Sequence, residues 1–172
     1  IRWESYALDA NPDAIWTADN PTVQPASIDS DAFTPKLGLR WSSDRLTVYA
    51  QYARGFRAPP FGDVNIGLNL PAFNYVALPN PDLKPERSDG YELGLRWGSE
   101  ALQASVAVYE NRFEDLIESR ANLGRNSHGQ LVFQSVNRDR ARIRGAELEA
   151  RWALDAVSEH ARGVYVDLSV SW

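Results

Sequence analysis

Apolar and polar residues alternate one by one through much of this chain, and this pattern restricts its fold more than any other feature. In the stretch YELGLRW at residues 91–97, every odd position is apolar or aromatic and the even positions hold Glu, Gly and Arg. Similar stretches occur at residues 36–41, 45–52, 102–108, 146–152 and 164–172. Successive residues of a strand point to opposite faces. Each stretch is therefore predicted to be a strand with one apolar and one polar face.

The lengths of these segments favour strands that cross a membrane. Tilted transmembrane strands need about ten residues, and aromatic residues gather near the segment ends, where an interfacial girdle would lie. These aromatics are Trp41, Tyr52, Tyr91, Trp97, Tyr109 and Trp152. The pattern predicts an all-β, antiparallel, up-and-down transmembrane β-barrel segment, with its apolar faces toward lipid and its polar faces toward a water-filled interior.

A soluble β-sandwich or other β-rich binding module is the alternative interpretation of the same alternation. In that fold the apolar faces would pack against one another. It would be indicated by a compact two-layer core that buries Leu93, Leu95, Val106, Val108 and Leu148 together.

Short and long connections alternate along the chain, as they do between the periplasmic and extracellular ends of outer-membrane barrels. Tight turns are predicted at 42–44 and 98–100 and a further turn at 155–163, and long connections at 10–31, 56–87 and 121–130. This gives about seven strands, whereas single-chain bacterial barrels have an even number from about eight upward. Residues 1–172 are therefore expected to be one partial barrel domain of a larger barrel, with strands missing on both sides.

Composition argues against several other classes of protein. The net charge of -5 and the pI of about 5.1 are unlike those of a nucleic-acid-binding domain. The chain has no Cys and only two His, His128 and His160, which leaves neither a disulfide nor a thiolate or His-rich metal site. Neither a phosphate-binding loop nor a convincing Ser/His setting is present. We therefore expect no enzyme and no required cofactor.

The connection between residues 55 and 86 carries two recognisable boxes. It opens with Phe56, Arg57, Ala58, Pro59 and Pro60, and it closes with Asn80, Pro81, Asp82 and Leu83. The boxes resemble the FRAP-type and NPDL/NPNL-type boxes of TonB-dependent receptors. The stretches FTPKLGLR at 33–40, SDGYELGLRW at 88–97 and RGAELE at 144–149 resemble strands of the same family, in the same order. The resemblance covers most of the chain from residue 33 to residue 154.

This resemblance implies a receptor in the cell outer membrane. Such receptors form a large barrel around an N-terminal plug, capture an extracellular ligand with their loops, and receive energy when TonB pulls on the plug. The implied partners are an extracellular iron ligand or haemoprotein, outer-membrane lipid, and the TonB complex through the plug, which is absent from this sequence. The two boxes are best known from receptors for haem and haemoproteins, so haem is the expected cargo. A ferric siderophore or another bulky nutrient stays open as the alternative.

One departure from the haem-receptor pattern affects the candidate ligand residues. Haem receptors with these boxes commonly carry an axial His between them, but residues 61–79 contain none. Tyr75 could bind haem iron through its phenolate, with Asn65, Asn69 or Asn74 as polar contacts. The alternative for Tyr75 is packing on Phe73 and the pocket wall.

Arg57 and the prolines of the boxes each allow two interpretations. The Arg57 guanidinium could bind a carboxylate such as a haem propionate, or it could pair within the base of the loop. Proline fixes φ and disfavours helix in the residue before it. The prolines could therefore only shape the loop, or they could also touch ligand.

Four arginines alternate at Arg138, Arg140, Arg142 and Arg144 and so share one face of a strand. That face is predicted to line the barrel interior, because an arginine facing the bilayer centre costs ~2–4 kcal/mol. Their expected partners on the preceding strand are Glu114, Asp115 and Glu118. If the arginines at even positions face the interior, the apolar residues at the even positions of 146–152 would face it as well. A β-bulge, which shifts the alternation by one residue, is therefore predicted near Gly145. His128 is expected at a solvated loop tip, and neither His is given a role.

Overall fold

The computed structural model describes residues 1–19, 21 and 24–172, and most of these residues lie in strands. They divide into two compact units, each of which is described by itself. The loop unit comprises Ile1–Thr34, Gly55–Ser88 and Phe113–Ala141, and the sheet unit comprises Pro35–Arg54, Asp89–Arg112 and Arg142–Trp172. Among the described residues, no helix is long and apolar enough to cross a membrane.

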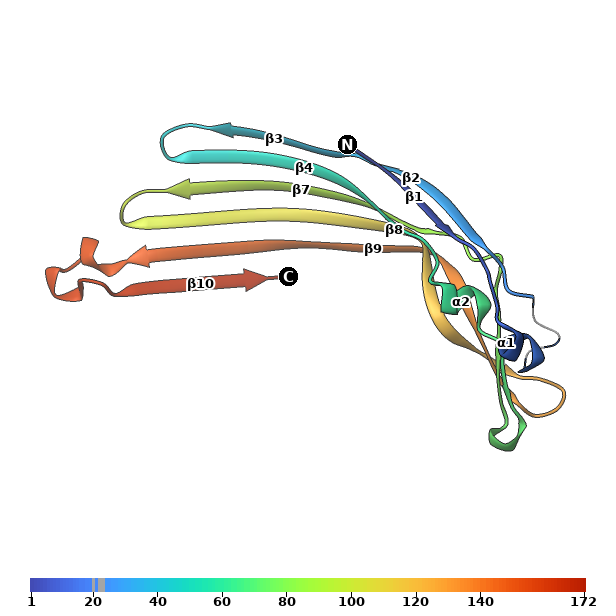
Figure 1. The fold of residues 1–172 in the computed structure, drawn as a ribbon. Helices are drawn as coiled ribbons and strands as arrows, with labels where there is room; N and C mark the ends of the chain where they lie inside the picture. The colour runs from blue at the N-terminus through green and yellow to red at the C-terminus, as the bar shows by residue number, and fades with distance from the viewer. Residues whose placement is uncertain (20, 22–23) are drawn as a thin grey trace. The chain divides into compact units, whose positions relative to one another are not determined.

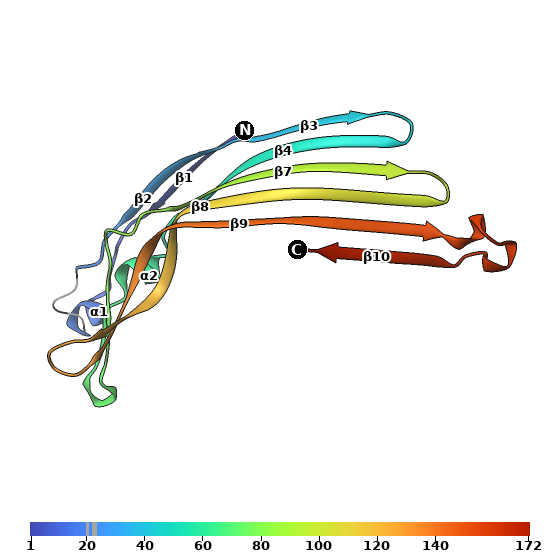
Figure 2. The ribbon, with the colours of Figure 1, turned by 180° about the vertical axis from the view of Figure 1, so that it is seen from behind.

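The sheet unit is a row of strands that lie side by side in chain order (Figures 1 and 2). The strands that contribute to it are β3 (Lys36–Ser42), β4 (Leu46–Arg57), β7 (Glu86–Gly98), β8 (Leu102–Arg125), β9 (Leu131–Ala153) and β10 (Tyr165–Ser171). Two 3-10 turns, η2 (Leu154–Ala156) and η3 (Glu159–Ala161), connect β9 to β10. Because each strand neighbours the next one in the chain, the up-and-down order predicted from the alternation is confirmed.

The registers of the sheet unit place apolar residues opposite one another on one face. In the β3–β4 pair, Leu37 lies opposite Tyr52 and Trp41 lies opposite Val48. In the β9–β10 pair, Leu148 faces Val170 in the same way. The neighbouring positions put polar residues on the other face. We call these two surfaces the apolar face and the polar face.

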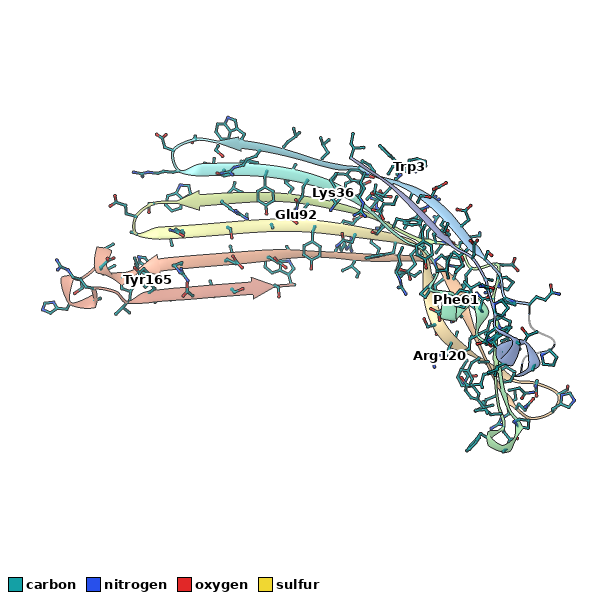
Figure 3. All side chains as sticks on the ribbon, viewed as in Figure 1. Trp3, Lys36, Phe61, Glu92, Arg120 and Tyr165 are labelled. Carbon is teal, nitrogen blue, oxygen red and sulfur yellow. The ribbon has the colours of Figure 1, made fainter. Side chains whose placement is uncertain are left out.

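The apolar face is exposed. Leu93 is 53% exposed, Val108 47% and Leu168 51%, and side chains project from both surfaces of the strands in Figure 3. The hydrophobic cluster of buried residues found among the described residues is small, consists of Ile28, Val64 and Leu83, and belongs to the loop unit. Within the part of the chain that the structure describes, no compact two-layer core buries Leu93 and Val108 together, as a soluble sandwich would.

Both predicted tight turns are present. Ser43 N–H donates to the carbonyl of Leu46 at 2.8 Å, which closes the turn between β3 and β4. Ser99 N–H donates to the carbonyl of Leu102 at 2.7 Å and does the same between β7 and β8. The turn predicted at 155–163 coincides closely with the two 3-10 turns between β9 and β10.

The long connection predicted at 121–130 is wrong. Strand β8 continues to Arg125 and β9 begins at Leu131, so a turn of residues 126–130 joins them. The Asn126 side chain forms this turn by accepting from the backbone N–H groups of His128 and Gln130, both at 3.0 Å. His128 lies exposed at its tip, as predicted. The end of β8 escaped prediction because Asn122, Gly124 and Arg125 are typical of polar connections between strands.

The loop unit contains the remaining elements. Strand β1 (Arg2–Leu8) pairs antiparallel with β2 (Ile28–Thr34), and α1 (Ala14–Asp19) lies in the connection between them. The connection from β4 to β7 holds α2 (Phe61–Asn65), β5 (Leu68–Leu70), the 3-10 turn η1 (Pro71–Phe73) and β6 (Tyr75–Leu78). Only Pro35 separates β2 from β3. Counting these two as one gives seven long strands among the described residues, in agreement with the prediction.

Two predictions for this part of β9 are wrong. Arg142 and Arg144 do not lie on the polar face, and the alternation of faces does not shift near Gly145. A Cβ on Gly145 would lie 2.6 Å from the Tyr109 hydroxyl, whereas Arg142 reaches Glu110, the next residue of β8. Gly145 and Arg142 thus lie on opposite faces. Ser105 contacts Glu149 on the Tyr109 side of the sheet. No parity change therefore separates Arg142 from Leu148, and both lie on the apolar face.

The cost of an arginine that faces lipid depends on its depth in the membrane, and it is small at this position. The penalty for arginine falls from ~2–4 kcal/mol at the bilayer midplane to ~0–1 kcal/mol near the interface. Arg142 and Arg144 directly precede the apolar stretch 146–152 in β9, so they belong at interfacial depth rather than at the bilayer centre.

Candidate functional site

The candidate site is the connection between β4 and β7, together with the β8 and β9 segments that hold it in the loop unit. At its base, Arg57 ends β4 and Glu86 begins β7. The Arg57 Nη1 donates to both carboxylate oxygens of Glu86, at 3.2 and 3.1 Å. Glu86 also accepts from the backbone N–H of Ile117 at 2.8 Å. Arg57 therefore pairs within the base of the loop, which is one of the two roles left open for it.

The first box turns the chain from β4 into α2. Pro59 is buried, and Pro60 is the residue that precedes the helix, with φ −63° and ψ 139°. Its carbonyl accepts from the backbone N–H groups of Asp63 at 2.9 Å and Val64 at 3.2 Å. The fixed φ of proline thus sets the angle at which the helix starts.

The second box attaches the far end of the connection to β9. The Asn80 side chain donates to the carbonyl of Ser135 at 2.8 Å and accepts from the backbone N–H of Asp82 at 3.1 Å. Leu83 is buried in the small hydrophobic cluster. Asn137 of β9 adds a further link, because its side chain accepts from Lys84 N–H at 2.8 Å and donates to the Lys84 carbonyl at 2.9 Å. Asn80 and Leu83 therefore act in loop attachment.

A carboxylate in α2 joins the helix to both β8 and β9. Ser135 is completely buried and donates to Asp63 Oδ1 at 2.8 Å, while Ser119 donates to Asp63 Oδ2 at 2.9 Å. The Ser135 hydroxyl also accepts from the backbone N–H of Arg120 at 3.1 Å. Arg120 has a positive φ of 52°, so this bond supports an irregular point of β8. We call Asp63, Ser119 and Ser135 the α2 clamp.

Two of the three asparagines predicted as ligand contacts have structural partners. The Asn65 amide is buried and bonds both backbone groups of Ala26, at 2.6 and 3.0 Å. Asn69 accepts from the Gln130 side chain at 2.9 Å. Asn74 is exposed, with a φ of 51°, at the turn between η1 and β6. Of these three side chains, Asn74 is therefore the one best placed to meet a ligand.

Tyr75 stacks on Phe133 of β9, with the ring centroids 4.9 Å apart and an angle of 24° between the planes. Phe73, the expected partner, is instead 77% exposed. The difference arises because β6 pairs in parallel with β9, which places Tyr75 opposite Leu131 and Ala77 opposite Phe133. Local sequence patterns carry no information on such a pairing.

A groove of about 590 Å³ opens beside α2 in the loop unit. Its walls include Trp16 from α1, Phe61 and Asn65 from α2, and Pro25; Figure 3 labels Phe61 beside the helix. The size lies within the range of about 300–1,000 Å³ that is typical of small-ligand sites. Trp16 and Phe61 were not predicted as site residues. The signal that could have indicated Trp16 is a large aromatic residue in an otherwise polar, Pro-rich connection.

The arginines of β9 find most of the carboxylates expected for them. In the loop unit, Arg138 Nε lies 2.6 Å from Glu118 and Arg140 Nε lies 4.0 Å from Glu114. Asp115, the third expected partner, has a positive φ of 55°, and its carbonyl accepts from the Asn137 side chain. Within the described part of the chain, no group of three or more His, Cys, Asp or Glu residues is arranged to hold a metal ion.

A family model described as TonB dependent receptor-like, beta-barrel matches residues 1–171. Among curated proteins, the hemoglobin-haptoglobin utilization protein B of Neisseria meningitidis serogroup C is 27% identical over 157 residues, which are 81% of this chain and 19% of that protein. The chain spans between 12% and 19% of the length of the first curated relatives that it matches.

Solved structures of outer-membrane receptors share the fold. The hemophore receptor HasR of Serratia marcescens, solved with its hemophore HasA and heme, is 23% identical with a TM-score of 0.64, over 98% of this chain and 28% of that one. The ferric enterobactin receptor PfeA of Pseudomonas aeruginosa is 22% identical with a TM-score of 0.66, over 85% of this chain and 23% of that one. Both likenesses concern the all-β transmembrane barrel fold.

Proposed function

The chain belongs to the TonB-dependent receptor family, and from that premise we propose that it forms part of an outer-membrane receptor that takes up haem or a haemoprotein. Barrels of this family lie in the outer membrane. Residues 1–172 would then belong to a single barrel domain, and the energy for uptake would come from the TonB complex acting on the plug of the receptor. The proposed receptor is no enzyme and needs no resident cofactor, because haem is its cargo.

The relationship to a hemoglobin-haptoglobin utilization protein, which covers 81% of the chain, is the observation that carries the proposal. The arrangement of the two boxes is consistent with it. Asn80 of the second box attaches one end of the β4–β7 connection to β9, and the α2 clamp attaches its middle to β8 and β9. A rigid base of this kind suits a loop that must meet a large, folded partner without collapsing.

We propose that Tyr75 and Asn74 contact the ligand from the turn between η1 and β6. Asn74 is exposed, and Tyr75, the next residue, is half-buried with its ring packed on Phe133. A phenolate is an established axial ligand of haem iron. Arg57 stays a candidate for a propionate, although it would have to exchange the Glu86 carboxylate for that of the ligand.

A ferric siderophore or another bulky nutrient is the second candidate cargo. It is favoured by the lack of His at residues 61–79, which removes the usual axial ligand. Tyr75 and the aromatic groove at Trp16 and Phe61 could serve such a ligand equally well.

The test is a titration of the receptor, purified from outer membranes, with haemin and, in parallel, with ferric enterobactin. We expect a saturable Soret shift with haemin and much weaker binding of ferric enterobactin. Tyr75→Phe keeps the ring on Phe133 but lacks the phenolate, so it should weaken the shift. Tyr165→Phe on β10 is the matched control and should leave it unchanged.

Two results would contradict these assignments. Saturable binding of the siderophore with no Soret shift from haemin would replace haem by the alternative cargo. A normal Soret shift in Tyr75→Phe would remove Tyr75 as an iron ligand while leaving the haem proposal intact.

A further inference from the structure

The apolar face of the sheet unit contains a groove of about 740 Å³. Most of its lining is apolar and includes Leu37, Leu39, Leu93, Val108 and Ala146. Barrels of this family turn such a face toward membrane lipid. The groove is therefore of the right chemistry and in the right place to hold a lipid acyl chain.

An aromatic pair marks one end of this groove. The rings of Tyr52 and Tyr91 lie 5.2 Å apart and both line the groove. The Tyr52 hydroxyl donates to Asp89 Oδ1 at 2.5 Å, so its polar end is bonded to a charged group beside the apolar lining. Tyrosines with an apolar body and a bonded polar tip are typical of the level of lipid headgroups. This end of the groove thus lies at the membrane interface.

A cluster of four arginines lies just beyond the tyrosines on the same face. Arg54 pairs with Asp89 at 2.9 Å, and Arg112 pairs with Glu110 at 2.5 Å while its guanidinium lies 5.6 Å from the centre of the Tyr91 ring. Arg142 is 3.8 Å from the same Glu110, and Arg144 lines the groove. Four guanidinium groups therefore share two carboxylates, which leaves the cluster with a positive charge.

The guanidinium groups are open to an incoming anion. The side chains of Arg112 and Arg142 are 58% and 59% exposed, and both converge on the one carboxylate of Glu110. Arginine binds phosphate oxygens through paired, charge-assisted hydrogen bonds, and its aliphatic stem can cover apolar surface while the charge stays at the interface. A soluble anion would satisfy the charge but would leave the adjoining groove unexplained.

We propose that this surface binds a membrane lipid whose phosphorylated headgroup carries a net negative charge. One acyl chain lies in the groove along Leu39, Leu93 and Val108. The phosphate lies against Arg112, Arg142 and Arg144. The site shares no residue with the β4–β7 connection, and it does not depend on which nutrient the receptor carries.

The experiment measures which lipid the receptor retains. Receptor purified from outer membranes is placed in bilayer discs that contain equal amounts of phosphatidylglycerol and phosphatidylcholine, and bound lipids are counted by native mass spectrometry. The test variant combines Arg112→Gln with Arg142→Gln. The matched control combines Arg40→Gln with Arg96→Gln, which removes the same charge from the polar face, where Arg40 lies opposite Tyr49 and Arg96 covers the Tyr49 ring.

We expect the unchanged receptor and the control to prefer phosphatidylglycerol. The test variant should lose that preference by about five-fold for each arginine removed, the factor that corresponds to ~1 kcal/mol per basic residue at an anionic surface. Heat-dependent mobility on gels verifies that each variant is folded. If the double variant does not fold, Arg144→Gln alone is used and should lose part of the preference.

Three outcomes would overturn the proposal. The first is equal retention of both lipids by the unchanged receptor. The second is a folded test variant with its preference intact, or a control that loses as much. The third is displacement of the bound lipid by millimolar inorganic phosphate, which would identify a general anion site rather than a lipid site.

Discussion

Glu86 is the residue that connects three strands at the base of the candidate site. Its carboxylate accepts from Arg57 at the end of β4 and from the backbone of Ile117 in β8, while Glu86 itself begins β7. Its side chain is only 13% exposed, against 54% for Arg57. The two partners of one ion pair therefore stand in unequal environments, and their removal should have unequal effects.

Glu86→Ala should lower the free energy of unfolding by about 1–3 kcal/mol, because the Ile117 N–H loses its acceptor in a partly buried setting. Arg57→Ala should lower it by roughly 0–1 kcal/mol, as expected for an exposed ion pair. Urea unfolding of the receptor in lipid vesicles measures both. Equal losses in the two variants would show that the ion pair, and not the backbone contact, is the stabilising bond.

The α2 clamp gives a second comparison between matched residues. Ser135→Ala should lower the free energy of unfolding by about 1–3 kcal/mol, because Asp63 and the Arg120 N–H both lose a buried partner. Ser119→Ala removes the other hydroxyl bonded to Asp63, at an exposed position, and should have a much smaller effect. Limited proteolysis of residues 58–85 is the measurement, with faster cleavage expected in Ser135→Ala alone. Equal cleavage rates in both variants would contradict the role given to the buried bond.

At the scale of elements, β4 and β7 are joined by an aromatic ring that lies over a glycine. A Cβ on Gly94 would lie 2.2 Å from Tyr49 Cζ, which no side chain tolerates. The Tyr49 hydroxyl donates to Glu92 at 2.7 Å, and Gln51 donates to the same carboxylate at 2.8 Å. Gly94 is therefore required for the ring to reach across the strand pair on the polar face.

Gly94→Ala should cost about 1–3 kcal/mol, because the Tyr49 ring must move and give up its bond to Glu92. Gly38→Ala in β3 is the control, since a Cβ there meets no atom within 4 Å. In a Tyr49→Ala background the cost at Gly94 should largely disappear. Urea unfolding gives all three values, and a cost that persists without the Tyr49 ring would refute the explanation.

The elements also show how far sequence reasoning reached. Strict alternation at 91–97 and 146–152 predicted the strands and their faces correctly, because each of those residues faces either an apolar or a polar surface. The β5–β6 pair and the last residues of β8 were missed. In the β4–β7 connection, Tyr75 contacts Phe133 and Asn80 contacts Ser135, and each partner is more than 50 residues away in the chain. A local sequence pattern carries no information on such contacts.

On the scale of the whole molecule, the exposed apolar face determines the surroundings in which the fold is stable. Leu93, which is 53% exposed, lies in the middle of the stretch 91–97. The order of strands and their faces could be predicted from sequence. The face of Arg142 could not be predicted in the same way. The assumption that every arginine avoids the lipid side left out the position of the residue between the bilayer centre and the interface.

Leu93→Arg should destabilise the receptor by ~2–4 kcal/mol, the cost of arginine at the lipid midplane. Gln103→Arg puts the same side chain on the polar face of β8 and is expected to change stability little. Urea unfolding in vesicles separates the two. A small effect of Leu93→Arg, comparable with that of Gln103→Arg, would mean that this face does not meet lipid.

The parallel pairing of β6 with β9 ties together two segments that are separated by about fifty residues of sequence. Leu131 N–H donates to the Asn74 carbonyl at 2.7 Å, and Gln130 donates to Asn69. Insertions or deletions in either segment would break this register unless the other changed with it. Natural variants of such a receptor should therefore diversify the two segments in concert, and a loop transplanted between relatives should work only when both segments are exchanged together.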